Sequence, residues 1–200
     1  MLGLVLIALL IPLNIVGRML VARYRDGDFH VRLSADQFRG WGGVAVAVML
    51  MGWGIVIALA LAGSARGVGT GAGLGVFGAG AGLITWAQFA MGASWRIGID
   101  HGEWTELVVG GPFRAVRNPI YLGMALSLVG IGLVSVPALS VVPAGVFLVG
   151  AEVQVRLVEE PYLHFNHPEY RSYAARVGRF LPGVGRLPRV RPVQVPVPGR

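Results

Sequence analysis

The sequence predicts an all-α protein that crosses a membrane about five times, and three observations lead to this prediction. First, 54% of the 200 residues are apolar and only 14% are charged, which is about half the charged share of a soluble domain. Second, the apolar residues gather in runs close to the ~20 residues that a helix needs to cross ~30 Å of hydrocarbon. Third, arginine-rich and arginine-poor connections alternate between these runs, as expected of a polytopic protein.

The apolar runs are the predicted membrane-spanning helices. The first three are long enough to span alone, whereas the last two are shorter and almost continuous. Only Ser135, Val136 and Pro137 separate these two, which predicts a tight helical hairpin. The five runs cover residues 2–22, 41–63, 69–92, 119–136 and 138–158.

The mixture of charged and apolar residues after the fifth run predicts a short interfacial helix within 159–179, broken at Pro168. The chain is therefore divided into N-terminal spans (1–92), a core (93–180) and a proline-rich basic tail (181–200). The end of that tail, Leu187–Arg200, is rich in proline, valine and arginine and is expected to be extended or disordered.

All 17 basic residues are arginine, and their distribution predicts the orientation of the chain. Arginines are frequent in 18–40, in 93–118 and after Glu159, but the second connection has only Arg66 and the hairpin turn has none. The positive-inside rule then places the N-terminus outside and the C-terminus in the cytoplasm of a cell membrane. The net charge of +7 is therefore explained by contact with the lipid bilayer, and no nucleic-acid partner is expected.

A glycine-rich stretch in the third run matches the dinucleotide fingerprint G-x-G-x-x-G at residues 73–78. That fingerprint needs a preceding strand and a helix start that faces solvent, and an apolar run offers neither. Gly71 with Gly75, and Gly78 with Gly82, form two pairs of small residues at helical spacing. These pairs predict close packing against another helix.

No metal site is expected. The chain has no cysteine, which excludes disulfides, cysteine nucleophiles and thiolate ligands. His164 and His167 are three residues apart, but no carboxylate or third histidine stands at a metal-ligand spacing in their segment. Two interfacial histidines are therefore the preferred interpretation.

Charged residues are concentrated at the end of the fifth run. At 100° per residue, Glu152, Arg156, Glu159 and Glu160 share one face of a helix, within an arc of about 100°. Ionisable residues in a span should face the bundle interior or a wet cavity. Two interpretations remain open at this point: a ladder of ion pairs at i, i+4 spacing, or a polar binding site.

The polar segment 93–122 is expected on the same side of the membrane as these acids. Its Gly110-Gly111-Pro112 sequence predicts a turn, and Asn118-Pro119 predicts the start of the fourth helix. Free N–H groups at that helix start can receive a carboxylate, and Glu159 and Glu160 can receive an amino group or ribose hydroxyls. S-adenosylmethionine carries all of these groups together with a sulfonium cation.

Two motifs carry a resemblance to a known family. The stretches LVVGGPFRAVRNPIY (107–121) and EEPYLHFNHPEYRSY (159–173) resemble the signature of isoprenylcysteine carboxyl methyltransferases and their bacterial relatives. Phospholipid N-methyltransferases share the same overall plan. The resemblance covers about residues 93–180, and its two motifs stand at matched separation across the predicted hairpin.

The resemblance implies a membrane methyltransferase that binds S-adenosylmethionine on its cytoplasmic side. It also implies that Arg156 orients the acceptor. The implied cofactor contacts are Thr105, Glu106, Leu107, Val108, Phe113, Asn118, Pro119, Ile120, Tyr121, Glu159 and Glu160.

The expected acceptor is a lipophilic small molecule or a prenylated substrate, methylated on a carboxyl oxygen. Two alternatives remain open: N- or S-methylation of a lipid or small hydrophobic molecule, and a non-enzymatic membrane scaffold or carrier that has kept the fold. Binding of S-adenosylmethionine distinguishes the enzymes from the scaffold.

Overall fold

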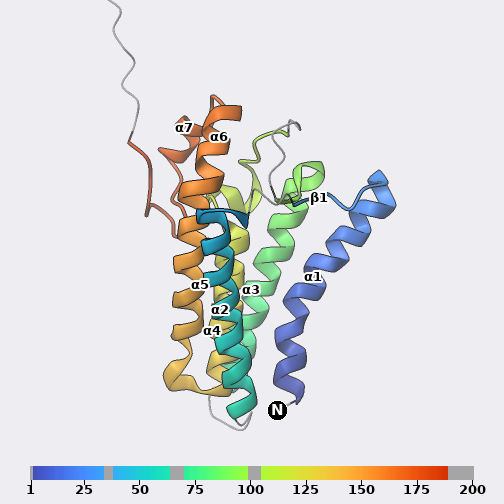
Figure 1. Cartoon of the computed structure of the whole chain (residues 1–200), viewed down its shortest axis with the longest axis vertical. Coiled ribbons are helices and arrows are strands. Elements are labelled where there is room, and N and C mark those ends of the chain that lie inside the picture. Colours follow the sequence, from blue (N-terminus) through green and yellow to red (C-terminus); the bar gives the residue numbers. More distant parts are fainter. Residues whose placement is uncertain (1, 34–37, 64–69, 99–104, 189–200) are drawn as a thin grey trace, which may run out of the picture.

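The computed structural model describes residues 2–33, 38–63, 70–98 and 105–188, and its main feature is a bundle of five helices (Figure 1). Four helical stretches are long and apolar enough to cross a membrane, and a fifth apolar helix has 17 residues. The predicted all-α polytopic membrane fold is therefore confirmed. The bundle helices are α1 (Leu2–Asp26), α2 (Trp41–Ala62), α3 (Thr70–Met91), α4 (Pro119–Ser135) and α5 (Val141–Gln154).

Short elements connect and cap these helices. The strands β1 and β2 form a two-residue parallel ribbon in which Val31 lies opposite Ile97, a feature absent from the prediction. The short elements are β1 (Val31–Arg32), η2 (Gly92–Ser94), β2 (Ile97–Gly98), η3 (Gly111–Arg114), η4 (Pro137–Leu139), η5 (Val155–Glu159), α6 (Glu160–Asn166) and α7 (Tyr170–Ala174).

The fifth span does not end at the predicted interfacial helix but continues into it. Helix α5 passes through η5, a π-helical segment, directly into α6, and this rod ends at Asn166. His167 is extended, with φ −128° and ψ 97°, because the ring of a following proline disfavours helical geometry at the residue before it. Pro168 therefore separates α6 from α7, as the sequence predicts.

The arginine-rich connections that the structure describes lie at one end of the bundle. The ribbon, η3, α6 and α7 gather at the upper end in Figure 1, whereas the N-terminus and the α4–α5 hairpin lie at the lower end. Successive connections therefore lie at opposite ends of the bundle, as expected for five spans that run up and down in turn. The side of the membrane that each end faces stays a prediction, as does the tail beyond Pro188, because residues 189–200 lie outside the described residues.

Helices α3 and α4 approach each other through two glycine pairs. A Cβ added at Gly80 would lie 2.5 Å from the Gly123 carbonyl oxygen, and one added at Gly130 would lie 2.7 Å from the Gly73 carbonyl oxygen. In both helices the two glycines are seven residues apart, so antiparallel helices bring them together pairwise. Backbone therefore packs on backbone along this seam.

The predicted packing glycines are the wrong ones. A Cβ at Gly71, Gly75, Gly78 or Gly82 would meet no atom of the described residues within 4 Å. The i, i+4 spacing identifies α3 as a helix with small residues, but it does not identify the face that meets α4. Gly73 and Gly80, which form the actual contact, belong to the opposite face.

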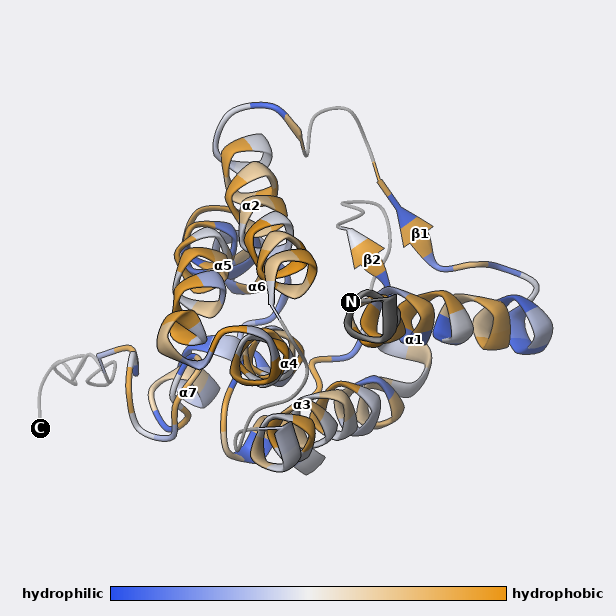
Figure 2. Cartoon of the chain, turned by 90° about the horizontal axis from the view of Figure 1, so that it is seen from below, coloured by the Kyte–Doolittle hydropathy of each residue, from blue (hydrophilic) through white to orange (hydrophobic). Residues whose placement is uncertain are grey.

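The bundle has apolar residues both inside and outside. Leu128, Ile131 and Phe147 are buried in the core, whereas Leu50 and Val149 on the outer faces are 63% and 60% exposed. Figure 2 shows apolar residues around the helices in a view along the bundle. A helix that is apolar on all faces is typical of a membrane span, because lipid replaces water at its outer surface.

Candidate active site

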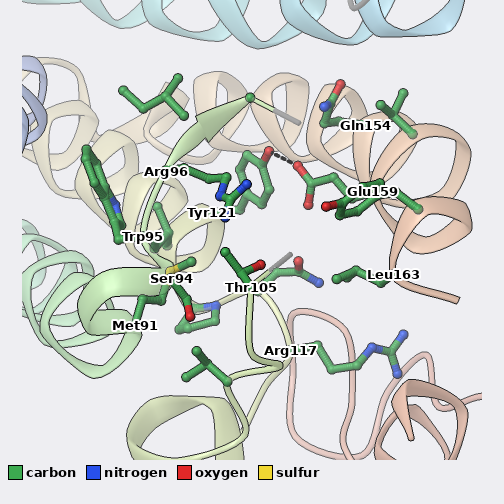
Figure 3. Close-up of a pocket in the computed structure, with 18 of the residues that line it drawn as sticks. Met91, Ser94, Trp95, Arg96, Thr105, Arg117, Tyr121, Gln154, Glu159 and Leu163 are labelled. Atoms are coloured by element: carbon green, nitrogen blue, oxygen red, sulfur yellow. Dashed lines mark hydrogen bonds between the residues drawn. The ribbon is translucent and has the colours of Figure 1, made fainter. Parts of the chain in front are cut away.

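A cavity of about 450 Å³ lies where the bundle meets its arginine-rich end. Its walls come from α1 to α5, from the segments around Trp95 and Thr105, and from α6 and α7 (Figure 3). The volume falls within the ~300–1,000 Å³ of small-molecule sites. The cavity is therefore large enough for a cofactor and part of an acceptor.

Most of the residues that the sequence assigned to a cofactor lie in this cavity wall. Ten of the eleven line it, although they come from two segments, 105–121 and Glu159, that are about 40 residues apart in the chain. The exception is Glu160, and Arg156 also lies outside the lining. The ten are Thr105, Glu106, Leu107, Val108, Phe113, Asn118, Pro119, Ile120, Tyr121 and Glu159.

A hydrogen bond joins the two motifs across the cavity. The Tyr121 hydroxyl, in the first turn of α4, donates to a carboxylate oxygen of Glu159 at 2.5 Å (Figure 3). Pro119 starts α4 at a position where its missing N–H costs nothing, so Tyr121 is fixed relative to the loop before it. This bond holds the Glu159 carboxylate at the cavity surface.

The π-helical segment η5 determines where the two acids point. The N–H of Glu160 bonds to the carbonyl of Val155, five residues back, so this turn holds more residues than an α-helical turn. Glu159 consequently faces the cavity, whereas Glu160 turns toward the C-terminal segment. π-Helical turns inside α-helices occur frequently at functional sites.

The prediction that four charged residues share one inward face is therefore wrong. It assumed 100° per residue throughout, and the π-helical turn breaks that periodicity. The side chain of Arg156 is 57% exposed and pairs with Glu152. Of the two ion pairs in the predicted ladder, Glu152–Arg156 is present. The second, Arg156–Glu160, is replaced by bonds from Glu160 to Arg117 and Arg179.

Arg117 also lines the cavity, but its buried guanidinium is taken up by contacts that organise the chain. One of its terminal nitrogens donates to the Ala174 and Val177 carbonyls at 2.9 and 2.8 Å. The other donates to the Glu160 carboxylate at 2.7 Å and to the Gly185 carbonyl at 3.1 Å. A charge that is 5% exposed needs such partners, because burying it without them is costly.

The loop before α4 is held by a buried tyrosine. The Tyr173 hydroxyl donates to the Phe113 carbonyl at 2.7 Å, which fixes the aromatic ring of Phe113 in the cavity wall. Burial raises the pKa of Tyr173 to about 12, so the hydroxyl keeps its proton at neutral pH. The predicted turn is present as η3, with Gly111 at a φ of +56° that favours glycine.

The cavity has a polar part and an apolar part. Glu159, Asn118 and Thr105 contribute polar groups to the lining. Apolar side chains of α1, α2, α3 and the first turns of α4, including Ile15 and Met49, contribute the apolar part of the lining. A compound with one polar and one apolar end matches this division.

Several lining residues were missed by sequence reasoning. Gln88 and Gln154 are polar residues within apolar runs, a signal of function that was available in the sequence. Arg96 reaches into the cavity beside Trp95 (Figure 3). The position of Trp95 is fixed by Arg18, which lies over its ring at 5.2 Å and donates to the Gly92 carbonyl at 2.6 Å.

Metal chemistry finds no support in the part of the chain that the structure describes. No group of three or more histidine, aspartate or glutamate side chains is placed to hold an ion there. The His164 Nδ1–H donates to the Glu160 carbonyl at 2.7 Å and the ring packs edge-on against Tyr170, so its environment is that of a packed side chain.

Comparison with known proteins identifies the chain at the family level. A family model described as phospholipid methyltransferase matches residues 68–172, which is just over half of the chain. The match runs from the start of α3 into α7 and includes both motifs of the cavity wall. No individual curated protein matches the sequence. The chain therefore belongs to the phospholipid methyltransferase family.

Proposed function

We propose that this protein is an S-adenosylmethionine-dependent methyltransferase whose acceptor is a lipophilic molecule taken from the bilayer. The observation that carries the proposal is the placement of Glu159, Tyr121 and Asn118 around one cavity that also has an apolar lining from the membrane helices. Membership in a methyltransferase family supports the reaction class.

The residues of the polar part fit the chemical groups of S-adenosylmethionine. Glu159 offers a carboxylate for the amino group or the ribose hydroxyls, and Asn118 offers an amide to the amino acid portion. Thr105 supplies a hydroxyl, and Phe113 supplies an apolar ring for the purine. When bound, this group supplies an electrophilic methyl on a sulfonium.

The protein's own contribution is positioning. Tyr121 bonds to the Glu159 carboxyl group at 2.5 Å, so this side chain is in position before a ligand arrives. The apolar part excludes water from the acceptor. A carboxylate acceptor is already ionised at neutral pH, so this reaction needs no general base.

The resemblance of both motifs to isoprenylcysteine carboxyl methyltransferases supports a carboxyl oxygen as the methylated atom. An acidic acceptor needs a positive partner, and two arginines are candidates. Arg96 lines the cavity, whereas Arg156, implied by the resemblance, is largely exposed and pairs with Glu152. We favour Arg96 because it alone of the two contacts the cavity.

Replacing each of these two arginines in turn shows which one binds the acceptor carboxylate. Arg96→Gln is expected to raise the KM for a carboxylate acceptor by about tenfold, since a charged hydrogen bond contributes ~1.5–3 kcal/mol. Arg156→Gln should leave the KM within about twofold, because exposed ion pairs contribute little. Steady-state kinetics with a prenylated cysteine analogue measures both. The reverse pattern would assign the acceptor to Arg156.

Calorimetry on the detergent-purified protein tests the function itself. Micromolar binding of S-adenosylmethionine and S-adenosylhomocysteine is expected. Labelled methyl transfer is then compared among a prenylated cysteine with a free carboxylate, an aminophospholipid and an alkyl thiol. Transfer to the amine or the thiol replaces the carboxyl proposal with N- or S-methylation. No binding by a folded protein favours the scaffold.

We also propose that the cavity end of the bundle faces the cytoplasm of a cell membrane, with the N-terminus outside. The arginines gathered at that end support this orientation, and a soluble cofactor would then reach the polar part directly. Reporter fusions to both termini measure the orientation. Activity of a cytoplasmic reporter at the N-terminus would contradict it.

A further inference from the structure

The chain from Ala174 to Leu187 folds back on itself as a closed loop, called here the C-terminal strap. The Leu187 N–H donates to the Ala174 carbonyl at 2.9 Å, and the Arg179 N–H donates to the Val184 carbonyl at 2.7 Å. A Cβ at Gly178 would lie 2.0 Å from the Leu181 carbonyl oxygen, so only glycine fits this turn. The strap lies beyond the residues that the family model matches.

The backbone of the strap holds one wall of the cavity. The Arg117 N–H donates to the Gly178 carbonyl at 2.8 Å, and the Asn118 N–H donates to the Arg179 carbonyl at 3.1 Å. The Asn118 side-chain amide donates to the same carbonyl at 3.2 Å. Asn118 is the residue immediately before α4, so the strap fixes the start of the helix that carries Tyr121.

The side chain of Arg179 holds the opposite wall. Its guanidinium donates to both oxygens of Glu160, each at 2.9 Å, and to Glu152 at 2.9 Å. Such a two-point contact fixes both distance and orientation. Glu160 directly follows Glu159, so the backbone that presents the cavity carboxylate is fixed with it.

We propose that Arg179 is a positioning residue of the methyltransferase site, because it joins the wall that carries Asn118 to the wall that carries Glu159. The inference rests on the proposed function. Arg179 does not line the cavity, so it acts only through these neighbours. Arg117 reaches Glu160 as well, but its other bonds go to strap carbonyls and therefore depend on the same loop.

A purely structural ion pair would have a different signature. Removing it would lower the stability of the whole chain, and cofactor affinity would fall only as far as folding does. A positioning residue affects the cavity before the bundle unfolds. Cofactor affinity and global stability must therefore be measured separately.

The test uses the full chain in detergent and the variants Arg179→Gln and Arg179→Lys. Arg179→Gln is expected to weaken S-adenosylhomocysteine binding by about 10- to 100-fold, the range seen at metal sites when a residue that orients a metal ligand is removed. Lysine keeps the charge but not the planar fork, so partial recovery is expected. The backbone amides of Arg117 and Asn118 donate to strap carbonyls, so their hydrogen exchange, measured in the absence of ligand, should be faster in both variants than in the wild type.

Two controls separate stability from positioning. Arg176→Gln removes an exposed arginine of the same strap and should change neither measurement. Leu128→Ala creates a cavity in the bundle core, far along α4, and should lower the unfolding temperature while retaining affinity. If Arg179→Gln does not fold, the same two measurements on Arg179→Lys, which keeps the charge but not the two-point contact, test the proposal.

The outcomes are distinct. Accelerated exchange with weakened binding supports the proposal, whereas accelerated exchange with wild-type affinity overturns it. Equal loss of affinity in Leu128→Ala and Arg179→Gln reduces Arg179 to a stabilising ion pair. Absence of binding by the wild-type chain overturns the proposed function and, with it, this role of Arg179.

Discussion

Glu159→Ala is expected to abolish detectable binding of S-adenosylmethionine, with a loss of about 100-fold or more. The physical reason is that a buried positive group on the ligand would lose its counter-charge, and such unpaired charges cost ~3–5 kcal/mol. Tyr121 would lose its acceptor at the same time. Calorimetric titration of the variant measures the effect.

Two variants sharpen this prediction. Glu159→Gln keeps an oxygen for the Tyr121 hydroxyl but removes the charge, so it separates hydrogen bonding from electrostatics. Glu169→Gln removes a carboxylate that immediately precedes α7 and is 60% exposed, and this variant should bind as the wild type does. Wild-type affinity in Glu159→Ala would disprove the assignment of this carboxylate to the cofactor.

Gly80→Leu is expected to prevent the bundle from assembling. Even a Cβ at Gly80 lies 2.5 Å from a backbone oxygen of α4 and 2.6 Å from the Ser127 hydroxyl, and backbone cannot rotate away. Overpacking of ordinary cores costs ~1–3 kcal/mol, and a whole leucine side chain at a glycine seam should exceed this. Thermal unfolding and the monodisperse yield in detergent measure the loss.

Gly78→Leu is the matched control for this seam. Gly78 belongs to the same helix, but a Cβ there meets no described atom within 4 Å. The added side chain therefore points away from α4, and the variant should unfold within a few degrees of the wild type. Similar damage from both substitutions would contradict the observed packing face of α3.

The positions of the helices could be predicted because hydrocarbon thickness and helix breakers act locally. The run from Trp41 and the proline at 119 begin helices α2 and α4 at those residues. The packing face of α3 could not be predicted in this way. A seam of glycines is chosen by the partner helix, and Gly71 resembles Gly73 in every respect except what it meets.

The composition of the cavity wall was predictable to the extent that short motifs carry it. Residues such as Asn118, Tyr121 and Glu159 stand in recognisable patterns, and the fold brings them to one cavity. The divergence of Glu159 and Glu160 was not predictable from helical periodicity, since one π-helical turn changes the direction of every later side chain. Arg179 had no local signal, because its partners lie 19 and 27 residues earlier in the chain.

The π-helical turn at η5 has a consequence for how this architecture evolves. A π turn and an α turn between the same two ends differ by a single residue, so an insertion or deletion in the last span can be absorbed there. The position of Glu159 and Glu160 is therefore independent of the seven-residue glycine spacing that fixes how α3 and α4 pack. Homologous chains can lengthen or shorten that span by one position while their carboxylates stay where they are, and alignments of the family should open a gap at residues 155–159.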